Sequence, residues 1–267
     1  MDAERIAVAA QKGGVAKSVT SLNLATGLAR ASWRVLLVDI DAQANSTSMF
    51  LDEDAVGVDL YDVLSGREPP SKAIVPTRVD GLSLLPSSLA VARLDTELIA
   101  MHRREMRVLE ALEPVLGDYD AVVLDLPPSL SPLVIAALGA ATSLVVPTDA
   151  SRWGKRGAEM FLEWSQDLRD ARVLSADLLG VLLTKVESGT RITRDIRVAL
   201  RASGLPLFDT EIPKRTGAER MVANQLLIGD DGSDEDITEA YAQLTVEVIT
   251  RVNEARARRS GRHAKGA

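Results

Sequence analysis

The stretch QKGGVAKS, residues 11–18, constrains the fold of this chain more than any other feature of the sequence. It follows the apolar run RIAVAA (5–10) and leads into the amphipathic run SVTSLNLATGLAR (18–30). A buried strand, a glycine-containing loop and a helix that begins at Lys-Ser form the context of a phosphate-binding loop. Such a loop belongs to folds in which helices pack against a parallel sheet.

The rest of the chain alternates between apolar runs of strand length and amphipathic runs of helix length. The runs predict strands over residues 5–10, 34–40, 82–86, 121–126, 143–148 and 178–184. They predict helices over residues 17–31, 88–100, 103–116, 131–140, 155–170, 190–202 and 235–258, the last with Ser233 and Asp236 as a capping box. We expect an α/β fold, a mostly parallel twisted sheet with helices on both faces and P-loop NTPase architecture.

Composition excludes several classes of site. The chain has no cysteine and only two histidines, which excludes disulfides, thiolate metal sites and a cysteine nucleophile and disfavours a His-rich metal site. No apolar run is long enough to span a bilayer and the N-terminus lacks a signal-peptide pattern, so we expect a cytoplasmic protein. We predict one domain over residues 1–258 and a basic, disordered tail over 259–267.

The loop carries the groups that bind phosphate. Its two glycines allow backbone N–H groups to point inward, and the helix that follows places a partial positive charge there. Lys17 is positioned to reach the β- and γ-phosphates of a nucleotide, and Ser18 offers a hydroxyl to Mg²⁺. The motif departs from the usual phosphate loop because Ala16 replaces its last glycine and Gln11 its first. A plain glycine turn with surface lysines is the simpler alternative.

Carboxylates follow two other predicted strands. Asp39 and Asp41 stand at the end of RVLLVDID, and Asp125 ends AVVLD before Pro-Pro. The carboxyl ends of parallel strands are where α/β folds form ligand sites, and a carboxylate there can hold a Mg²⁺-bound water. Taken singly, each of these residues could equally be a polar strand end or a capping aspartate.

Together these segments resemble the ParA/MinD superfamily of P-loop ATPases. KGGVAKS is similar to its deviant Walker A box, DIDAQAN to its switch I segment, and YDAVVLDLPPS to its Walker B strand. The resemblance implies a dimer that binds ATP and Mg²⁺ and hydrolyses ATP. In this family the first lysine, here Lys12, contacts the nucleotide held by the partner subunit. This implied role explains why the loop has a second lysine.

The resemblance also assigns roles to particular residues. It implies catalytic roles for Lys12, Lys17 and Asp41, with Asp41 orienting the attacking water, and Mg²⁺ contacts for Ser18, Asp39 and Asp125. Gln43 and Asn45 keep their motif positions, while Ala42 and Ala44 replace the usual Pro and Gly. The implied nucleotide contacts are Lys12, Gly13, Gly14, Val15, Ala16, Lys17, Ser18 and Val19, with Thr184 and Pro213 beside the adenine.

Within the superfamily, the segments DAQAN and LSLLPSSLAVARLDTEL favour the ParA/Soj branch. That branch implies an ATP-dependent homodimer, non-specific DNA, a ParB-like adaptor that stimulates hydrolysis, segregation of chromosome or plasmid DNA, and a nucleoid-associated location. The C-terminus NEARARRSGRHAKGA lacks the bulky apolar residues of a membrane-binding helix, which argues against attachment to a membrane. The alternative is a MinD-like or cargo-positioning ATPase that acts on a protein scaffold or a membrane.

Two further readings have less support. A reductase-like relative with an iron–sulfur cluster needs cysteines, and this chain has none. A binding protein with an inactive site would account for Ala16 and Ala42, but the lysines and the carboxylates of the motifs are intact.

A basic helix face is the expected DNA surface. In RITRDIRVALR (191–201) four arginines share one arc, while Ile192, Ile196 and Leu200 occupy another arc and face the core. No base-reading group is evident, so we expect contacts with phosphates. The predicted DNA-binding residues are Arg191, Arg194, Arg197, Arg201, Lys214, Arg215 and Arg220. A solvated helix face is the alternative, and the basic C-terminal tail is a rival site.

Overall fold

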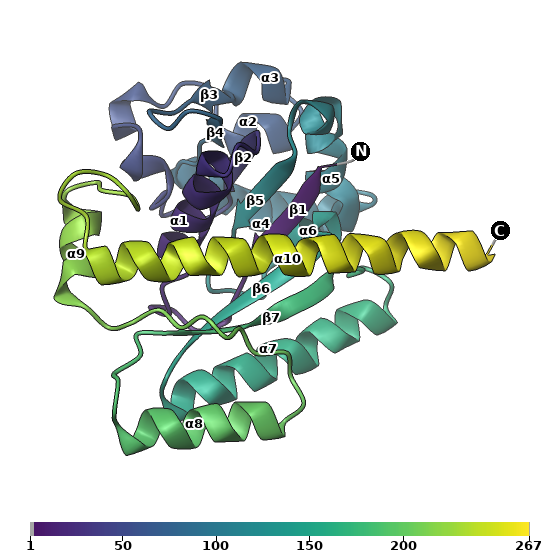
Figure 1. The fold of residues 1–267 in the computed structure, drawn as a ribbon. Coiled ribbons are helices and arrows are strands. Elements are labelled where there is room, and N and C mark those ends of the chain that lie inside the picture. Colours follow the sequence, from purple (N-terminus) through teal and green to yellow (C-terminus); the bar gives the residue numbers. More distant parts are fainter. Residues whose placement is uncertain (1–2, 267) are drawn as a thin grey trace.

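A seven-stranded sheet lies at the centre of the fold (Figure 1). The computed structural model describes residues 3–266, and at residues 192, 218–219, 222 and 262–266 it describes the backbone only. The strands lie in the order β3-β4-β2-β5-β1-β6-β7, all parallel except β3, which pairs antiparallel with β4. They are β1 (Glu4–Val8), β2 (Val35–Asp39), β3 (Val75–Pro76), β4 (Leu82–Leu85), β5 (Ala121–Asp125), β6 (Ser143–Asp149) and β7 (Asp177–Thr184). All six predicted strands are confirmed, and the short edge strand β3 was not predicted.

Helices cover both faces of the sheet, as predicted. The α-helices are α1 (Lys17–Arg30), α2 (Leu60–Leu64), α3 (Pro70–Ala73), α4 (Leu94–Glu97), α5 (Arg107–Leu112), α6 (Pro132–Ala140), α7 (Arg152–Asp170), α8 (Arg191–Ala202), α9 (Thr216–Ala223) and α10 (Glu235–Gly266). One hydrophobic core forms between the sheet and α1 and α10, and a second between the sheet and α2, α5, α6 and α7. The central strands are buried on both faces, which explains their continuous apolar sequences.

Two predicted helices are shorter than expected. Over residues 88–100 and 103–116 only α4 and α5 are α-helical, and 3₁₀ turns fill the remainder. Between them Met101 is extended and Arg103 adopts a left-handed conformation with φ of 54°, so the helix cannot continue. The helix α10 begins at residue 235 as predicted, but its predicted capping box is wrong: Asp234 rather than Ser233 caps the helix, and its carboxylate accepts from the N–H of Ile237 at 3.1 Å.

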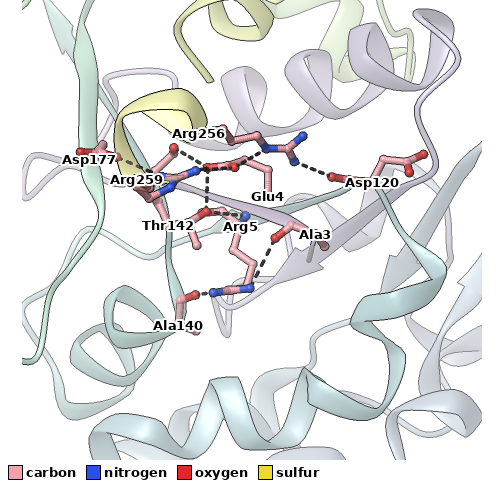
Figure 2. Close-up of polar contacts among 10 residues, drawn as sticks. Ala3, Glu4, Arg5, Asp120, Ala140, Thr142, Asp177, Arg256 and Arg259 are labelled. Atoms are coloured by element: carbon pink, nitrogen blue, oxygen red, sulfur yellow. Dashed lines mark hydrogen bonds and ion pairs between the residues drawn. The ribbon is translucent and has the colours of Figure 1, made fainter. Parts of the chain in front are cut away.

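The C-terminal helix is anchored at the amino-terminal edge of the sheet. Figure 2 shows Glu4 between Arg256 and Arg259, two residues of α10. Glu4 is 2% exposed and its carboxylate accepts from Arg256 Nε at 2.9 Å and from Arg259 Nη2 at 2.7 Å. Arg259 also contacts Asp177 of β7. The predicted boundary at residue 258 therefore falls inside α10, and Arg259 is part of the folded domain rather than of a disordered tail; the side chains of 262–267 lie outside the described residues.

Candidate nucleotide-binding site

The loop between β1 and α1 forms a cradle open to one side. Ala16 precedes α1 in the left-handed conformation, with φ of 61° and ψ of 33°, and no side chain caps the first N–H groups of the helix. Gly14 also has a positive φ, 75°, and a Cβ added at Gly13 or Gly14 would meet no atom within 4 Å. The uncapped N–H groups at the start of α1 and the open space beside Gly13 and Gly14 together suit a phosphate group.

The cradle is one wall of an open cleft of about 440 Å³. The residues that line it come from the loop, from the start of α1, from the segment after β2, from the turn after β5 and from the end of α9 and the residues that follow it: Gly13, Gly14, Ala16, Lys17, Ser18, Val19, Leu22, Asp41, Asn45, Ser48, Met49, Pro128, Ala223 and Gln225. The topology explains this convergence, because β1, β2 and β5 are neighbours whose carboxyl ends share one edge.

The two lysines of the loop lie in different environments. Lys17 is 7% exposed, and its ammonium donates to the backbone oxygen of Lys12 at 3.3 Å. Burial lowers the pKa of Lys17, and the nearby carboxylates of Asp125 and Asp41 oppose that shift. Lys12 is more exposed, and its ammonium lies 2.5 Å from Asp149 Oδ2 at the end of β6. Lys17 thus faces into the cleft, whereas Lys12 contacts an acidic side chain of its own chain.

Asp125 lies fully buried beneath the loop. Its carboxylate accepts from Ser21 Oγ at 2.9 Å and from Ser46 Oγ at 2.6 Å, and the hydroxyl of Ser18 also donates to it. Burial raises the pKa of Asp125, and the hydroxyl groups partly oppose that shift. A buried carboxylate surrounded by hydroxyl groups and beside a cradle for phosphate is a donor set that suits Mg²⁺.

Asp39 does not fit the predicted metal contact. It pairs in register with Asp125 across β2 and β5, but its Oδ1 accepts from the N–H of Asp41. Its Oδ2 accepts from both the N–H and the hydroxyl of Thr47, each at 2.8 Å. Burial and the neighbouring Asp125 raise the pKa of Asp39 to about 8. The structure therefore makes Asp39 a support of the segment 41–47 rather than a direct ligand.

Asp41 is held at the mouth of the cleft. Its carboxylate accepts from the N–H of Gln43 at 2.9 Å, and its backbone oxygen accepts from the hydroxyl of Ser87 at 2.8 Å. Ser87 in turn donates its N–H to the hydroxyl of Thr47, the residue bound to Asp39. Sequence reasoning did not identify Thr47 or Ser87, because hydroxyl residues in loops carry no distinguishing pattern.

A second, more apolar hollow of about 400 Å³ adjoins the loop. Pro213 lines it, together with Gly14, Ala16, Val19, Lys185, Ile212, Lys214, Arg215, Ile237 and Tyr241. Thr184 does not line it: this residue is fully buried, and its hydroxyl donates to the backbone oxygens of Val15 and Thr148. Its side chain therefore supports the loop from behind rather than facing this hollow.

The predicted basic face on α8 is only partly open. Ile196 and Leu200 are buried, as expected, while the side chain of Ile192 lies outside the described residues. Arg194 and Arg201 are exposed, and Arg191 lies 3.7 Å from Asp195. Arg197 instead makes a bidentate ion pair with Glu211, at 2.6 and 2.7 Å, and this pair raises the pKa of Arg197.

The other predicted DNA-binding residues are also divided between paired and exposed side chains. Lys214 pairs with Glu187 at 2.5 Å, and Arg215 pairs with Asp236 at 2.6 Å. Arg220 is exposed on α9. Within residues 3–266, no helix is long and apolar enough to cross a membrane.

Comparison with known proteins identifies relatives along nearly the whole chain. A family model described as an AAA domain matches residues 3–178. The chain is 37% identical to the chromosome-partitioning ATPase Soj of Thermus thermophilus over 254 residues, 94% of this chain and 97% of Soj. It is 32% identical to the chromosome partitioning protein ParA of Caulobacter vibrioides over 262 residues, 95% of this chain and 96% of ParA.

A solved structure gives the same fold. The cobyrinic acid a,c-diamide synthase of Mycobacterium smegmatis, determined with a bound ATP analog and magnesium, superposes with a TM-score of 0.82 at 32% identity. The match covers 92% of this chain and 94% of that one. The sheet and the loop described above are therefore those of a P-loop ATPase.

Proposed function

Because the chain belongs to the ParA/Soj family of partition ATPases, we propose that it segregates chromosome or plasmid DNA through a cycle of ATP-dependent dimerisation. ATP joins two subunits, the dimer binds DNA without sequence preference, and a ParB-like protein stimulates hydrolysis and release. This cycle places the protein on the nucleoid in the cytoplasm. The contrast between Lys12 and Lys17 is the observation that carries the proposal.

Lys17 serves the nucleotide of its own subunit. It is buried at the base of the cleft, where its charge is poorly solvated and gains most from a phosphate group. Lys12 is directed away from that position and pairs with Asp149. A lysine outside its own cleft is available to the nucleotide of a second subunit, where it neutralises charge only when both subunits are present.

The hydroxyl of Ser18 and the carboxylate of Asp125 would hold Mg²⁺, since both lie beside the cradle and already contact each other. The ion supplies positive charge to the β- and γ-phosphates of ATP. Asp39 positions the segment that carries Asp41 through its bonds to Thr47 and to the N–H of Asp41. The cradle formed by Gly13 and Gly14 accepts the phosphate oxygens.

Asp41 orients the attacking water. Its carboxylate lines the cleft and is fixed by the N–H of Gln43, so it enters the reaction already positioned. The ring of Pro213 and the side chain of Ile212 form an apolar surface for the adenine in the adjoining hollow. The base then lies between this surface and Val19 of the first turn of α1.

DNA binds through arginines that contact phosphates. Arg194 and Arg201 lie seven positions apart on α8, and both are exposed. Arg191 and Arg220 are exposed as well, while Arg197, Lys214 and Arg215 are paired with acidic residues of their own chain. We assign the principal contacts to Arg194 and Arg201. A dimer presents two copies of this pair and gains affinity from both.

Retention on a DNA-coated surface tests the proposal. The protein is applied with ATP, with ADP or without nucleotide, at constant Mg²⁺ and salt. Retention with ATP only, equal for fragments of unrelated sequence and lost when a ParB-like protein is added, is the expected result. Equal retention under all three conditions contradicts ATP control. Capture of the ATP-bound protein by lipid vesicles instead of DNA would support a MinD-like positioning ATPase.

A further inference from the structure

An apolar stripe runs along one side of α7. Positions 153, 157, 160 and 164 are spaced by four, three and four residues, so they share one side of a helix. Trp153, Gly157, Met160 and Trp164 occupy these positions. Trp153 is 76% exposed and Met160 45% exposed, although both are large and apolar. We refer to these four residues as the α7 stripe.

Two residues of the stripe, Trp153 and Met160, are not part of the core of their own chain. Ala158, Phe161 and Leu168 lie on another side of α7 and are buried against the sheet. Trp164 is half-buried and packs against the ring of Phe161, with 5.8 Å between ring centroids. Toward the N-terminal end of the helix the stripe therefore faces solvent, and an exposed Trp on such a stripe is typical of an interface.

The stripe borders Lys12. A Cβ placed on Gly157 would lie 3.6 Å from Cβ of Lys12, an ordinary contact distance, so the backbone of α7 at 157 lies directly beside the lysine. Asp149, the ion-pair partner of Lys12, comes three residues before α7. The side of the molecule that carries Lys12 thus also carries the α7 stripe.

Charged residues beside the stripe are arranged for pairing with an identical helix. Arg152 and Arg156 lie near the N-terminal end of α7, and Glu163 and Asp167 lie on the same flank farther along. All four are exposed, and none of them forms an ion pair within the described part of the chain. When two copies of such a helix pack antiparallel, equivalent flanks meet with their ends reversed. Arg156 then faces the partner's Glu163, and the same register brings Arg152 to the partner's Asp167.

We propose that the α7 stripe packs antiparallel against the same stripe of a second copy across a two-fold axis in the ATP-bound dimer. This inference rests on the proposed function, which places Lys12 at the subunit interface. Met160 lies close to the axis, and each Trp153 packs toward the partner's Trp164. The contact is isologous, which means that each subunit contributes the same surface. The contact is therefore complete in a dimer and leaves no stripe exposed for a third copy. Four ion pairs border an apolar seam and select the antiparallel orientation.

Shielding of Trp153 on dimerisation tests the contact. The chain has three tryptophans, so the signal of Trp153 is the difference between the native chain and the Trp153→Phe variant. With ATP and Mg²⁺, acrylamide quenching of this signal falls severalfold as dimer forms on size-exclusion chromatography, and ADP leaves it unchanged. Trp153→Ala weakens dimerisation roughly tenfold or more, the range of an interface hot spot. Because the side chain is exposed in one copy, this variant folds normally.

A charge exchange tests the orientation. Arg156→Glu and Glu163→Arg each place like charges against the partner and weaken the ATP-dependent dimer about tenfold. The double variant restores it to within about threefold of the native chain. Residues 156 and 163 are about 10 Å apart along one helix, beyond direct contact, so this rescue requires a second copy. Arg103→Glu, on a different surface, is the matched control and leaves dimerisation unchanged.

The outcomes separate this inference from the proposed function. A dimer that forms with ATP while Trp153 stays open to acrylamide, or a charge exchange without rescue, overturns the α7 contact and leaves the partition cycle intact. Shielding of Trp153 only after a ParB-like protein is added assigns the stripe to that protein and also overturns the inference. If the native chain forms no dimer with ATP, the proposed function itself fails.

Discussion

Lys12 Nζ lies 2.5 Å from Asp149 Oδ2, so the first lysine of the phosphate loop is paired with a carboxylate at the end of β6 in its own subunit. The two side chains are 35% and 21% exposed, and ion pairs in such positions contribute only about 0.2–1 kcal/mol. In the proposed dimer, a phosphate group of the second subunit's nucleotide would compete easily with this carboxylate. We therefore expect the Lys12–Asp149 pair to oppose dimerisation only weakly.

Removing the carboxylate of Asp149 should favour the ATP-dependent dimer. Asp149→Asn abolishes the competing charge but keeps an oxygen that accepts from the hydroxyl of Ser151. We expect half-maximal dimerisation at an ATP concentration about two- to fivefold lower, which corresponds to the loss of an interaction of this strength. Light scattering during an ATP titration measures it. Lys12→Ala is the companion variant and should not dimerise; an unchanged midpoint for Asp149→Asn would show that the pair does not restrain Lys12.

Lys17→Ala should abolish ATP binding. The variant removes the buried ammonium that neutralises the β- and γ-phosphates, and no other lysine lines the cleft within the described residues. Titration with a fluorescent ATP analogue measures affinity directly. Lys12→Ala is the matched control, because it removes an equal charge beside the loop and should leave binding to the single subunit nearly unchanged. Equal affinity of Lys17→Ala and the native chain would refute the assignment of the loop.

Asp41→Ala should separate binding from hydrolysis. The carboxylate lines the cleft but supports no other element, since its side chain accepts only from the adjacent Gln43 within the described contacts. We expect ATP binding and dimerisation to persist while turnover falls about 100-fold or more, the scale of a lost positioned catalytic group. Phosphate release and size-exclusion chromatography measure the two effects. Turnover at the native rate would assign the water to another residue.

The sheet could be predicted from the sequence because its strands are buried on both faces. Continuous runs such as AVVLD at β5 are apolar at successive positions, a pattern that few other environments require. The loop after β1 was equally clear, since glycines and a Lys-Ser pair at a helix start have few other uses. The short elements α2, α3, α9 and β3 were missed because a few residues contain too little periodicity to detect.

Long-range pairing of side chains could not be predicted. Helical periodicity placed Arg197 on the basic face, but Glu211, fourteen positions away, lies opposite it and binds its guanidinium. Thr184 stands at a strand end that faces the site, yet its hydroxyl is directed toward backbone oxygens behind the loop. From the sequence the basic C-terminus resembles a solvated tail. In the structure, however, two of its arginines pair with the buried carboxylate of Glu4.

Exchanging the exposed arginines of α8 should remove DNA binding. Arg194→Glu with Arg201→Glu reverses four charges on each dimer, and contacts with phosphates depend steeply on charge and salt. We expect no ATP-dependent retention on DNA at about 0.1 M salt, while ATP-driven dimerisation persists. Arg103→Glu with Arg104→Glu makes the same charge change on another surface and should retain binding. If instead deletion of residues 260–267, which keeps Arg259 and its ion pair with Glu4, alone removes DNA binding, the C-terminal basic segment carries the contact.

Glu4 should make stability depend on pH. Burial acts to raise its pKa, but hydrogen bonds from Ser143 and Thr142 and the guanidinium groups of Arg256 and Arg259 outweigh burial and hold the pKa below 4.5. A carboxyl with a lowered folded-state pKa stabilises the protein fully above its unfolded-state value of 4.5 and loses this contribution as pH falls through the folded-state value.

The variant Glu4→Gln removes this charge and leaves its two arginines beside a neutral amide. At pH 7 we expect the free energy of unfolding to fall by about 3 kcal/mol, the lower end for breaking a buried ion pair, because both arginines remain partly exposed. The difference from the native chain should shrink as pH decreases below 4.5, where the native carboxylate also becomes protonated. Urea denaturation at several pH values measures both effects. A difference that stays constant with pH would indicate that Glu4 stabilises α10 by packing rather than by charge.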